Sequence, residues 1–304
     1  MEEKQAGITA LITAYARAYH ATHEVPLIFN DFKVDQFYTN EERATFDQQL
    51  ASLLKLIAPE LEAQHLDQKT ALSLVMQLHL APITLSRSRY CEDCLEEAVH
   101  GDVSQYIILG AGLDTFAFRR SDLENRLQIF EIDHPITQAL KRQRIAMAGW
   151  LIPVNLHLVP VNFSNENLLD ALMHSPYDQT KTTFFSWLGV TYYLSNEDIE
   201  NNLRLITKIA PRGSTFVFDY LEKDAFLPEK VNPRVQLMQA IAYQVGEPMK
   251  VGFKPSELAD YLLRLGFNLE EDLNPAAIEA RYFADRNDRY HAFPQIHFAK
   301  AVIM

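Results

Sequence analysis

From residue 105 onward, short apolar runs alternate with amphipathic segments. The runs are QYIILG (105–110), LQIFEID (127–133), LHLVPVNF (156–163), TTFFSWL (182–188) and STFVFDY (214–220). Continuous apolar strands separated by helical patterns are typical of a parallel sheet that helices cover on both faces. Two further strand candidates, AIEARYF (277–283) and HFAKAVIM (297–304), follow a helix that ends near Gly266. The pattern predicts an α/β fold with a doubly wound, mostly parallel sheet of seven strands.

The first eighty residues and one later stretch follow other patterns. Apolar residues recur at helical spacing at Ile8, Leu11, Ile12 and Tyr15, and again at Leu50, Leu53, Leu54 and Ile57. This predicts a helical N-terminal cover over residues 1–80 and an α/β core over residues 81–304. Residues 221–256 interrupt the alternation and are predicted to be an insertion after the fifth strand.

We expect the cover and the insertion to form a lid and a substrate pocket beside the sheet. The insertion carries apolar and aromatic residues suited to such a pocket, namely Phe226, Leu237, Met238, Ile241, Tyr243 and Phe253. Packing within the insertion, or between subunits, is the alternative interpretation of the same residues.

Composition places the chain among ordinary globular proteins. It has 304 residues, 48% of them hydrophobic, with 28 Lys+Arg against 40 Asp+Glu and a formal net charge of −12. This balance excludes disordered and coiled-coil chains, and the acidic charge argues against a nucleic-acid partner. The chain shows no secretory signal pattern and no stretch of the roughly 18 apolar residues that span a bilayer. We therefore expect a cytoplasmic protein with no membrane partner; the sequence leaves the oligomeric state open.

The cysteines and histidines do not form a recognisable metal or redox motif. Cys91 and Cys94 have CxxC spacing, but they supply only half of a tetrahedral zinc site and fall in a helical run. The histidines, including His134 and His297, lack the HxxxH and Cys-His spacings of metal sites. We therefore expect no metal.

The segment that follows the first predicted strand has the features of a nucleotide site. Gly110-Ala111-Gly112 stands directly after QYIIL, and Asp133 ends the next strand, 21 residues beyond Gly112. Glycines at a strand-to-helix turn let the backbone approach a ligand closely, and an acid at the next strand end is placed to bind a ribose diol. A tight turn with a helix-capping carboxylate is the alternative. The strand context favours the cofactor interpretation.

Other residues bear on which nucleotide this is. A dinucleotide fingerprint has a third glycine where this chain has Thr115, which counts against NAD. S-adenosylmethionine instead needs a partner for its amino-acid carboxylate and polar contacts to ribose and adenine. Arg87 and Arg89 precede the first strand and are candidates for the carboxylate, although two residues apart on a helix they point in different directions. Asn162 and Phe163, at the end of the third strand, are candidates for adenine.

Several blocks of the chain resemble a known family. SRSRYCED, QYIILGAGLDTFAFR, FEIDHPITQALKR, the strand ending VNF, and WLGVTYYL are similar to the leucine carboxyl methyltransferase family of S-adenosylmethionine-dependent enzymes, and more closely to its bacterial branch of predicted O-methyltransferases. TAYARAYH and PLIFNDFKVDQF extend the resemblance to nearly the whole chain. It implies a Rossmann-like class I methyltransferase fold, S-adenosyl-L-methionine as cofactor and methyl transfer to an oxygen.

The resemblance also implies residue roles. Arg87, or less favourably Arg89, would bind the methionine carboxylate. Gly110 and Gly112 match the family's glycine turn, and Asp133 matches its ribose carboxylate. Asn162 stands where the family often has aspartate beside adenine, and an amide can also accept that hydrogen bond.

Two residues near the fourth strand bear on the acceptor. Tyr193 matches a family tyrosine that faces the acceptor pocket. Leu188 departs from the family pattern, because many members have glutamate there, and this puts a polar contact from that position in doubt.

The chemistry of methyl transfer limits what the protein must supply. An in-line displacement at a sulfonium needs alignment in a dry pocket and no metal. A carboxylate acceptor is already ionised near neutral pH, whereas a phenol or alcohol needs proton removal, and the sequence offers no obvious base. Tyr193 and Tyr220, which follow neighbouring strands, are candidates to orient the acceptor, with half-buried packing as the alternative. Arg281, in a predicted strand, is a candidate partner for an anionic acceptor or a surface ion pair.

The leading functional hypothesis is an S-adenosyl-L-methionine-dependent methyltransferase that acts on an oxygen, either a carboxylate or a hydroxyl, of a small molecule or an exposed carboxylate. One alternative is an NAD-dependent oxidoreductase or epimerase on a similar sheet. Another is a non-catalytic cofactor-binding protein, which the apolar Leu188 and the missing base keep open. Acceptor identity lies in the variable cover and not in the shared sheet.

Overall fold

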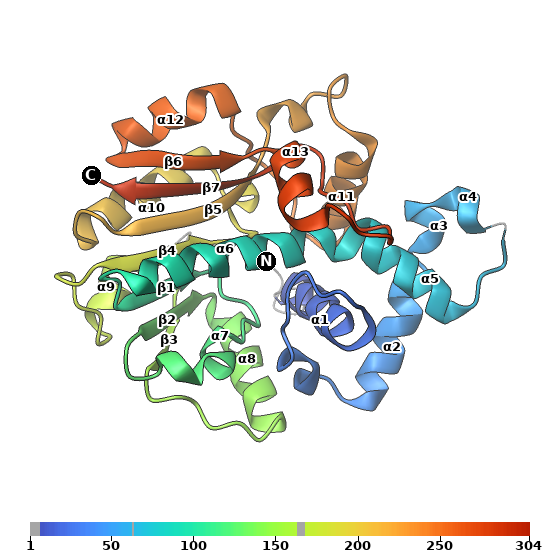
Figure 1. Ribbon diagram of the computed structural model, residues 1–304, viewed down its shortest axis with the longest axis horizontal. Coiled ribbons are helices and arrows are strands. Elements are labelled where there is room, and N and C mark those ends of the chain that lie inside the picture. Colours follow the sequence, from blue (N-terminus) through green and yellow to red (C-terminus); the bar gives the residue numbers. More distant parts are fainter. Residues whose placement is uncertain (1–6, 63, 163–167) are drawn as a thin grey trace.

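The computed structural model describes residues 7–62, 64–162 and 168–304. Within them the chain forms a seven-stranded sheet of order β3-β2-β1-β4-β5-β7-β6 (Figure 1). The strands are β1 Gln105–Leu109, β2 Gln128–Asp133, β3 Leu156–Pro160, β4 Thr183–Trp187, β5 Thr215–Leu221, β6 Phe267–Leu273 and β7 Ile296–Ile303. The first five run parallel, and β7 runs antiparallel to both β5 and β6. The predicted α/β class and seven-stranded, mostly parallel sheet are confirmed.

One strand prediction is wrong. Residues 277–283 are not a strand but continue the short helix α13 (Pro275–Ile278) into a π-helical turn, Glu279–Phe283. Asn274 starts this helix, because its side chain accepts a hydrogen bond from the backbone N–H of Ala277 at 2.9 Å. The sixth strand is instead the polar edge segment FNLEEDL at 267–273, which lacks the continuous apolar run of a central strand. Arg281 therefore lies in a helical turn.

Twelve further helices surround the sheet in the described residues. They are α1 Ile8–His23, α2 Asn40–Ala51, α3 Leu54–Ile57, α4 Pro59–Glu62, α5 Gln68–Val75, α6 Pro82–His100, α7 Phe116–Arg119, α8 Pro135–Met147, α9 Leu168–Met173, α10 Asn196–Ile209, α11 Pro233–Gln244 and α12 Pro255–Arg264. Ser195 begins α10 with a capping box that it completes with Asp198. No helix among the described residues combines the length and apolar character needed to cross a membrane.

The core lies on both faces of the sheet. Alternate residues of β1 enter different clusters: Tyr106 and Ile108 belong to the cluster that includes residues of α1 and α6, whereas Ile107 and Leu109 belong to the cluster that includes residues of α10 and α12. This two-sided burial explains why the strand reads as a continuous apolar run. In Figure 1, α6 crosses one face of the sheet.

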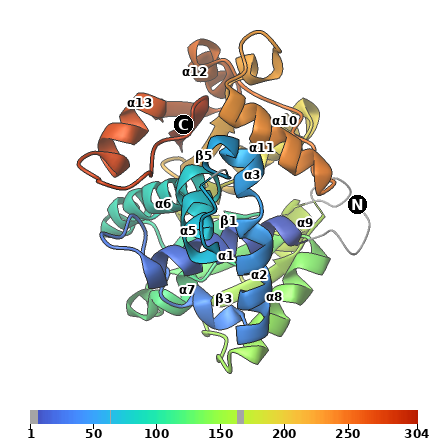
Figure 2. The ribbon, with the colours of Figure 1, turned by 90° about the vertical axis from the view of Figure 1, so that its right-hand side faces the viewer.

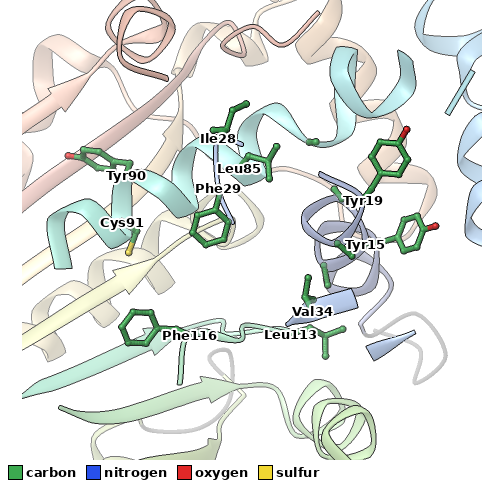
Figure 3. Close-up of a cluster of buried hydrophobic side chains, with 14 of the residues drawn as sticks. Tyr15, Tyr19, Ile28, Phe29, Val34, Leu85, Tyr90, Cys91, Leu113 and Phe116 are labelled. Atoms are coloured by element: carbon green, nitrogen blue, oxygen red, sulfur yellow. The ribbon is translucent and has the colours of Figure 1, made fainter. Parts of the chain in front are cut away.

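The N-terminal helix α1 lies at the carboxyl ends of the central strands (Figure 1 and Figure 2). Its buried Tyr15 and Tyr19 belong to the same cluster as Leu85 of α6 and Leu113 of the turn after β1 (Figure 3). This packing fixes α1 against the segment that carries the glycine turn.

The two cysteines lie on the buried side of α6. Cys91 and Cys94 are free thiols, and burial raises the pKa of both. The described residues contain no group of three or more metal-ligating side chains. The CxxC spacing is therefore accounted for by core packing.

The insertion after β5 leaves and returns at neighbouring points of the backbone. Glu222 and Phe253 form an isolated parallel bridge, and the Phe253 N–H donates to the carbonyl of Leu221 at 2.9 Å. Between these points the chain forms α11 and a loop through residues 245–252.

Candidate functional site

A cavity of about 710 Å³ opens at the carboxyl ends of β1, β2 and β4. Strand order places β4 directly beside β1, with β2 on the other side of β1, so the chain reverses direction across the sheet at this point. Ligands of open α/β sheets bind at such switch points. The cavity wall is completed by α1, by α6 and by residues 246–250 of the insertion.

The predicted glycine turn forms one side of this cavity. Gly110 and Gly112 have φ values of 72° and 55°, in the left-handed region that favours glycine, and Ala111 between them also lines the wall. The Gly112 N–H donates to the Asp133 carboxylate at 2.5 Å. The turn and the end of β2 are thus joined at the cavity.

Asp133 is held by two backbone donors. One oxygen accepts from Gly112 and the other from the N–H of His134 at 2.6 Å. Burial raises the pKa of this carboxyl, and the two backbone donors act in the opposite direction. The carboxylate is therefore oriented at the cavity wall, with lone pairs remaining for a ligand.

Arg87 reaches the cavity from α6 and is held by residues after β4 and in β5. Its Nη1 donates to the Tyr192 hydroxyl at 2.8 Å and to the buried Asp219 carboxylate at 3.1 Å. The other Asp219 oxygen accepts from the N–H of Gly189 at 2.6 Å. Among the described residues, no hydrogen-bond partner is recorded for Nη2, which leaves that donor available at the wall.

Arg89 lies elsewhere. Its side chain is half exposed and pairs with Asp93, one helical turn further along α6, at 2.7 Å. It does not line the cavity. Of the two arginines, the fold brings only Arg87 to the glycine turn and Asp133, as the separation of two residues on a helix demands.

The third strand and the segment after the fourth supply further parts of the wall. Asn162 lines the cavity, whereas Phe163 lies outside the described residues. Leu188 also lines it, so the wall is apolar at that position.

Of the two candidate tyrosines, Tyr193 and Tyr220, only the first lies at the cavity. Tyr193 lines the cavity, and no hydrogen-bond partner of its hydroxyl is recorded among the described residues. Burial raises its pKa, so the phenol is a protonated donor at neutral pH. Tyr220 is fully buried and donates to Asp272 of β6 at 2.8 Å. Successive side chains of a strand face opposite sides of a sheet, so Asp219 points toward Arg87 and Tyr220 points to the other face.

Sequence reasoning missed several cavity residues. Arg17 of α1 lines the wall and is fixed by Asp31, whose carboxylate accepts from Nε at 2.9 Å. Thr9 of α1 donates to Glu247 of the insertion, which joins the N-terminal cover to the insertion. The available signal for Arg17 was a single charged residue in the otherwise uncharged run from Ala14 to Tyr19.

The insertion contributes different residues from those expected. The cavity wall includes Gly246, Glu247, Pro248 and Lys250, and none of the predicted apolar residues Phe226, Leu237, Met238, Ile241, Tyr243 and Phe253. Five of these side chains, all except that of Ile241, pack on the core or line other cavities. Periodicity identified apolar positions but carried no information on how the loop after α11 turns.

The sheet order, the antiparallel last strand and the cavity between the glycine turn and Asp133 define a class I methyltransferase fold. Over 97% of both chains the structure resembles a DUF574 family protein of Streptomyces avermitilis, with a TM-score of 0.57 at 13% identity. A Thermobifida fusca protein assigned to the methyltransferases gives a TM-score of 0.53 at 16% identity, over 95% of this chain and 93% of that chain. Both likenesses concern the fold alone.

Sequence comparison gives the family. Residues 10–207 match the model of the leucine carboxyl methyltransferase family. YktD of Bacillus subtilis, whose name assigns it to the S-adenosyl-L-methionine-dependent methyltransferases without stating an acceptor, is 38% identical over 303 residues, 99% of each chain. The chain therefore belongs to the leucine carboxyl methyltransferase family and is an S-adenosyl-L-methionine-dependent methyltransferase. This decides against the NAD-dependent alternative.

Proposed function

We propose that Arg87, Asp133 and Asn162 hold S-adenosyl-L-methionine in the cavity beside β1. Arg87 offers a guanidinium N–H at the wall to the methionine carboxylate. The ion pair with Asp219 holds this guanidinium in position. Asp133 offers carboxylate lone pairs to the ribose hydroxyls, and Asn162 offers its amide to adenine. When bound, the cofactor supplies an electrophilic methyl group on a sulfonium. The separate positions of the guanidinium and the carboxylate on one wall suit its charged tail and its sugar.

The second part of the proposal concerns the acceptor: a carboxylate oxygen of a small molecule. The observation that carries it is Tyr193, a protonated hydroxyl without a recorded partner at the cavity wall. A phenol that donates can orient an anionic oxygen but cannot remove a proton from an alcohol.

Two other polar groups on this wall, His134 and Glu247, already have partners of their own. His134 Nδ1 accepts from the Ile136 N–H at 3.3 Å, so a neutral ring carries its proton on Nε2 and donates there. Glu247 accepts the Thr9 hydroxyl. A carboxylate acceptor needs no base and suits this set of donors, with the cover and insertion excluding water around it.

The acceptor class is tested with methyl-labelled S-adenosyl-L-methionine and a fractionated metabolite pool. Carboxyl methyl esters release labelled methanol in mild base, whereas ethers and N-methyl products keep the label. We expect base-labile product. Tyr193→Phe should lower kcat/KM about tenfold, the equivalent of one hydrogen bond. Tyr243→Phe, which changes a 73% exposed tyrosine outside this cavity, should have no effect. A base-stable product from the wild-type protein would refute carboxyl methylation.

Cofactor binding is tested separately by calorimetry with S-adenosylhomocysteine. Arg87→Met should weaken binding about 10- to 100-fold through the lost charge-assisted hydrogen bond. Arg89→Met removes the same charge from the exposed side of α6 and should leave the affinity unchanged. Equal affinities for both variants would show that the carboxylate binds elsewhere.

A further inference from the structure

A second cavity, of about 540 Å³, lies away from the methyltransferase site. One wall comes from α3, α4 and the π-helical turn Met76–Leu80, and the other from the first turns of α11 and from residues 289–291. Figure 2 shows α3 beside α11. The two cavities share no lining residue, so this one is independent of the function proposed above.

The first wall is largely apolar. Leu56, Ile57 and Leu61 line it from α3 and α4, together with Leu78, and Leu237 faces them from α11. Leu56 remains 45% exposed. This surface suits a hydrocarbon group.

The opposite wall contains Arg234, for which no ion pair is found within the described residues. The Arg234 guanidinium lies over the Phe293 ring, 4.1 Å from its centroid, and Nη1 donates to the Ala292 carbonyl at 3.2 Å. Its Nε and Nη2 are buried and have no hydrogen-bond partner in the part of the chain that the structure describes. Burial lowers the pKa of Arg234 to about 10. Glu279, the acid that acts against this shift, is already bonded to the N–H of Ala292 at 2.6 Å.

Two more polar side chains, His79 and Arg289, line the same cavity. The Nδ1 atom of His79 is buried without a partner among the described residues, and burial lowers the pKa of this imidazole to about 4, so it is neutral at neutral pH. Arg289 is exposed at the cavity edge, and Glu60 is the acid in the wall. Arg234 and Arg289 carry two positive charges and Glu60 carries one negative charge, so a ligand with one negative charge would balance the charged groups of the wall.

We propose that this cavity binds a small aliphatic monocarboxylate, with its carboxylate on the exposed Arg289 beside the Arg234 guanidinium and its hydrocarbon body against the leucines of α3, α4 and the π-helical turn. A buried guanidinium without an ion-pair partner is costly, and a carboxylate in the cavity supplies the missing negative charge. The cavity volume falls within the range of small-molecule sites. The acid Glu60 disfavours ligands with several negative charges.

The probe is octanoate, titrated into the full chain by calorimetry in the presence of saturating S-adenosylhomocysteine. We expect one octanoate per chain, and much weaker binding of octanol, which lacks the charge. Arg234→Met should weaken octanoate binding about 10- to 100-fold. The matched variant Arg212→Met removes an exposed arginine outside this cavity and should bind like the wild type.

Two further readouts keep the test decisive. Arg234→Met should retain the wild-type affinity for S-adenosylhomocysteine, which shows that the variant is folded. Arg289→Met should also weaken octanoate binding. Because Arg289 is exposed, this variant serves as the test if Arg234→Met proves unstable. Absence of octanoate binding to the wild type, equal affinity in the Arg234 and Arg212 variants, or displacement of octanoate by S-adenosylhomocysteine would each overturn the proposal and leave the proposed methyltransferase function untouched.

Discussion

Gly189→Ala tests whether the position of Arg87 controls cofactor binding. A Cβ atom built at Gly189 would lie 2.5 Å from Arg87 Nη1 and 2.7 Å from Cζ, and real Cβ contacts essentially never fall below 3.0 Å. The guanidinium must therefore retreat from Asp219 or Tyr192. The left-handed φ of 72° adds a backbone cost of about 1 kcal/mol. A lost charge-assisted hydrogen bond adds about 2 kcal/mol.

The matched control is Gly149→Ala. Gly149 has a φ of 66°, and an added Cβ meets nothing within 4 Å, so this variant carries the backbone strain without the clash. We expect denaturant unfolding to show a loss of about 1 kcal/mol for Gly149→Ala and about 3 kcal/mol for Gly189→Ala. By calorimetry, only Gly189→Ala should bind S-adenosylhomocysteine about 10- to 100-fold more weakly. Equal affinities in the two variants would refute the argument that Arg87 is positioned through Gly189.

Three further outcomes follow from buried charges. The affinity for S-adenosylhomocysteine should fall as pH drops through the raised pKa of Asp133, above the usual aspartate range, and Asp133→Asn should bind weakly with no such acid limb. Burial lowers the pKa of His297, but its bonds to Asp272 and Glu222 outweigh burial and leave the pKa raised. Its contribution to the free energy of unfolding is therefore complete below about pH 6.5 and is lost as pH rises through the folded pKa. His297→Gln should remove this trend from denaturant titrations. Lys141→Met should destabilise the fold by about 3–5 kcal/mol by leaving Glu131 buried alone, and adding Glu131→Leu should restore most of that loss; no recovery would contradict the pairing.

The central sheet was predictable because its strands are buried on both faces. Such strands appear as uninterrupted apolar runs, and β1 to β5 follow the runs in the sequence. β6 was missed because it is an edge strand with charged residues, while AIEARYF has enough apolar residues to imitate a strand. In AIEARYF, the buried Ile278 and Phe283 are five residues apart, which is the spacing of the hydrogen bonds in a π-helical turn.

The candidate site was predictable only where it depends on the sheet. Gly110, Gly112 and Asp133 follow strand ends, so strand order alone brings them together. Tyr220 lies away from this cavity because neighbouring side chains of a strand face opposite sides of the sheet, and Asp219 is the one that faces Arg87. Glu247 and Lys250 lie in a loop whose path depends on tertiary contacts, which local pattern does not encode.

The bridge between Glu222 and Phe253 has a consequence for how the acceptor range of such a fold can change. A segment whose two ends meet at one rung can be lengthened, shortened or exchanged without moving β5, since the entropy of closing a loop rises only slowly with its length. Transplanting residues 223–252 between relatives is accordingly a graft that would bring a new Gly246–Lys250 rim to the cavity while leaving the glycine turn and Asp133 unaltered.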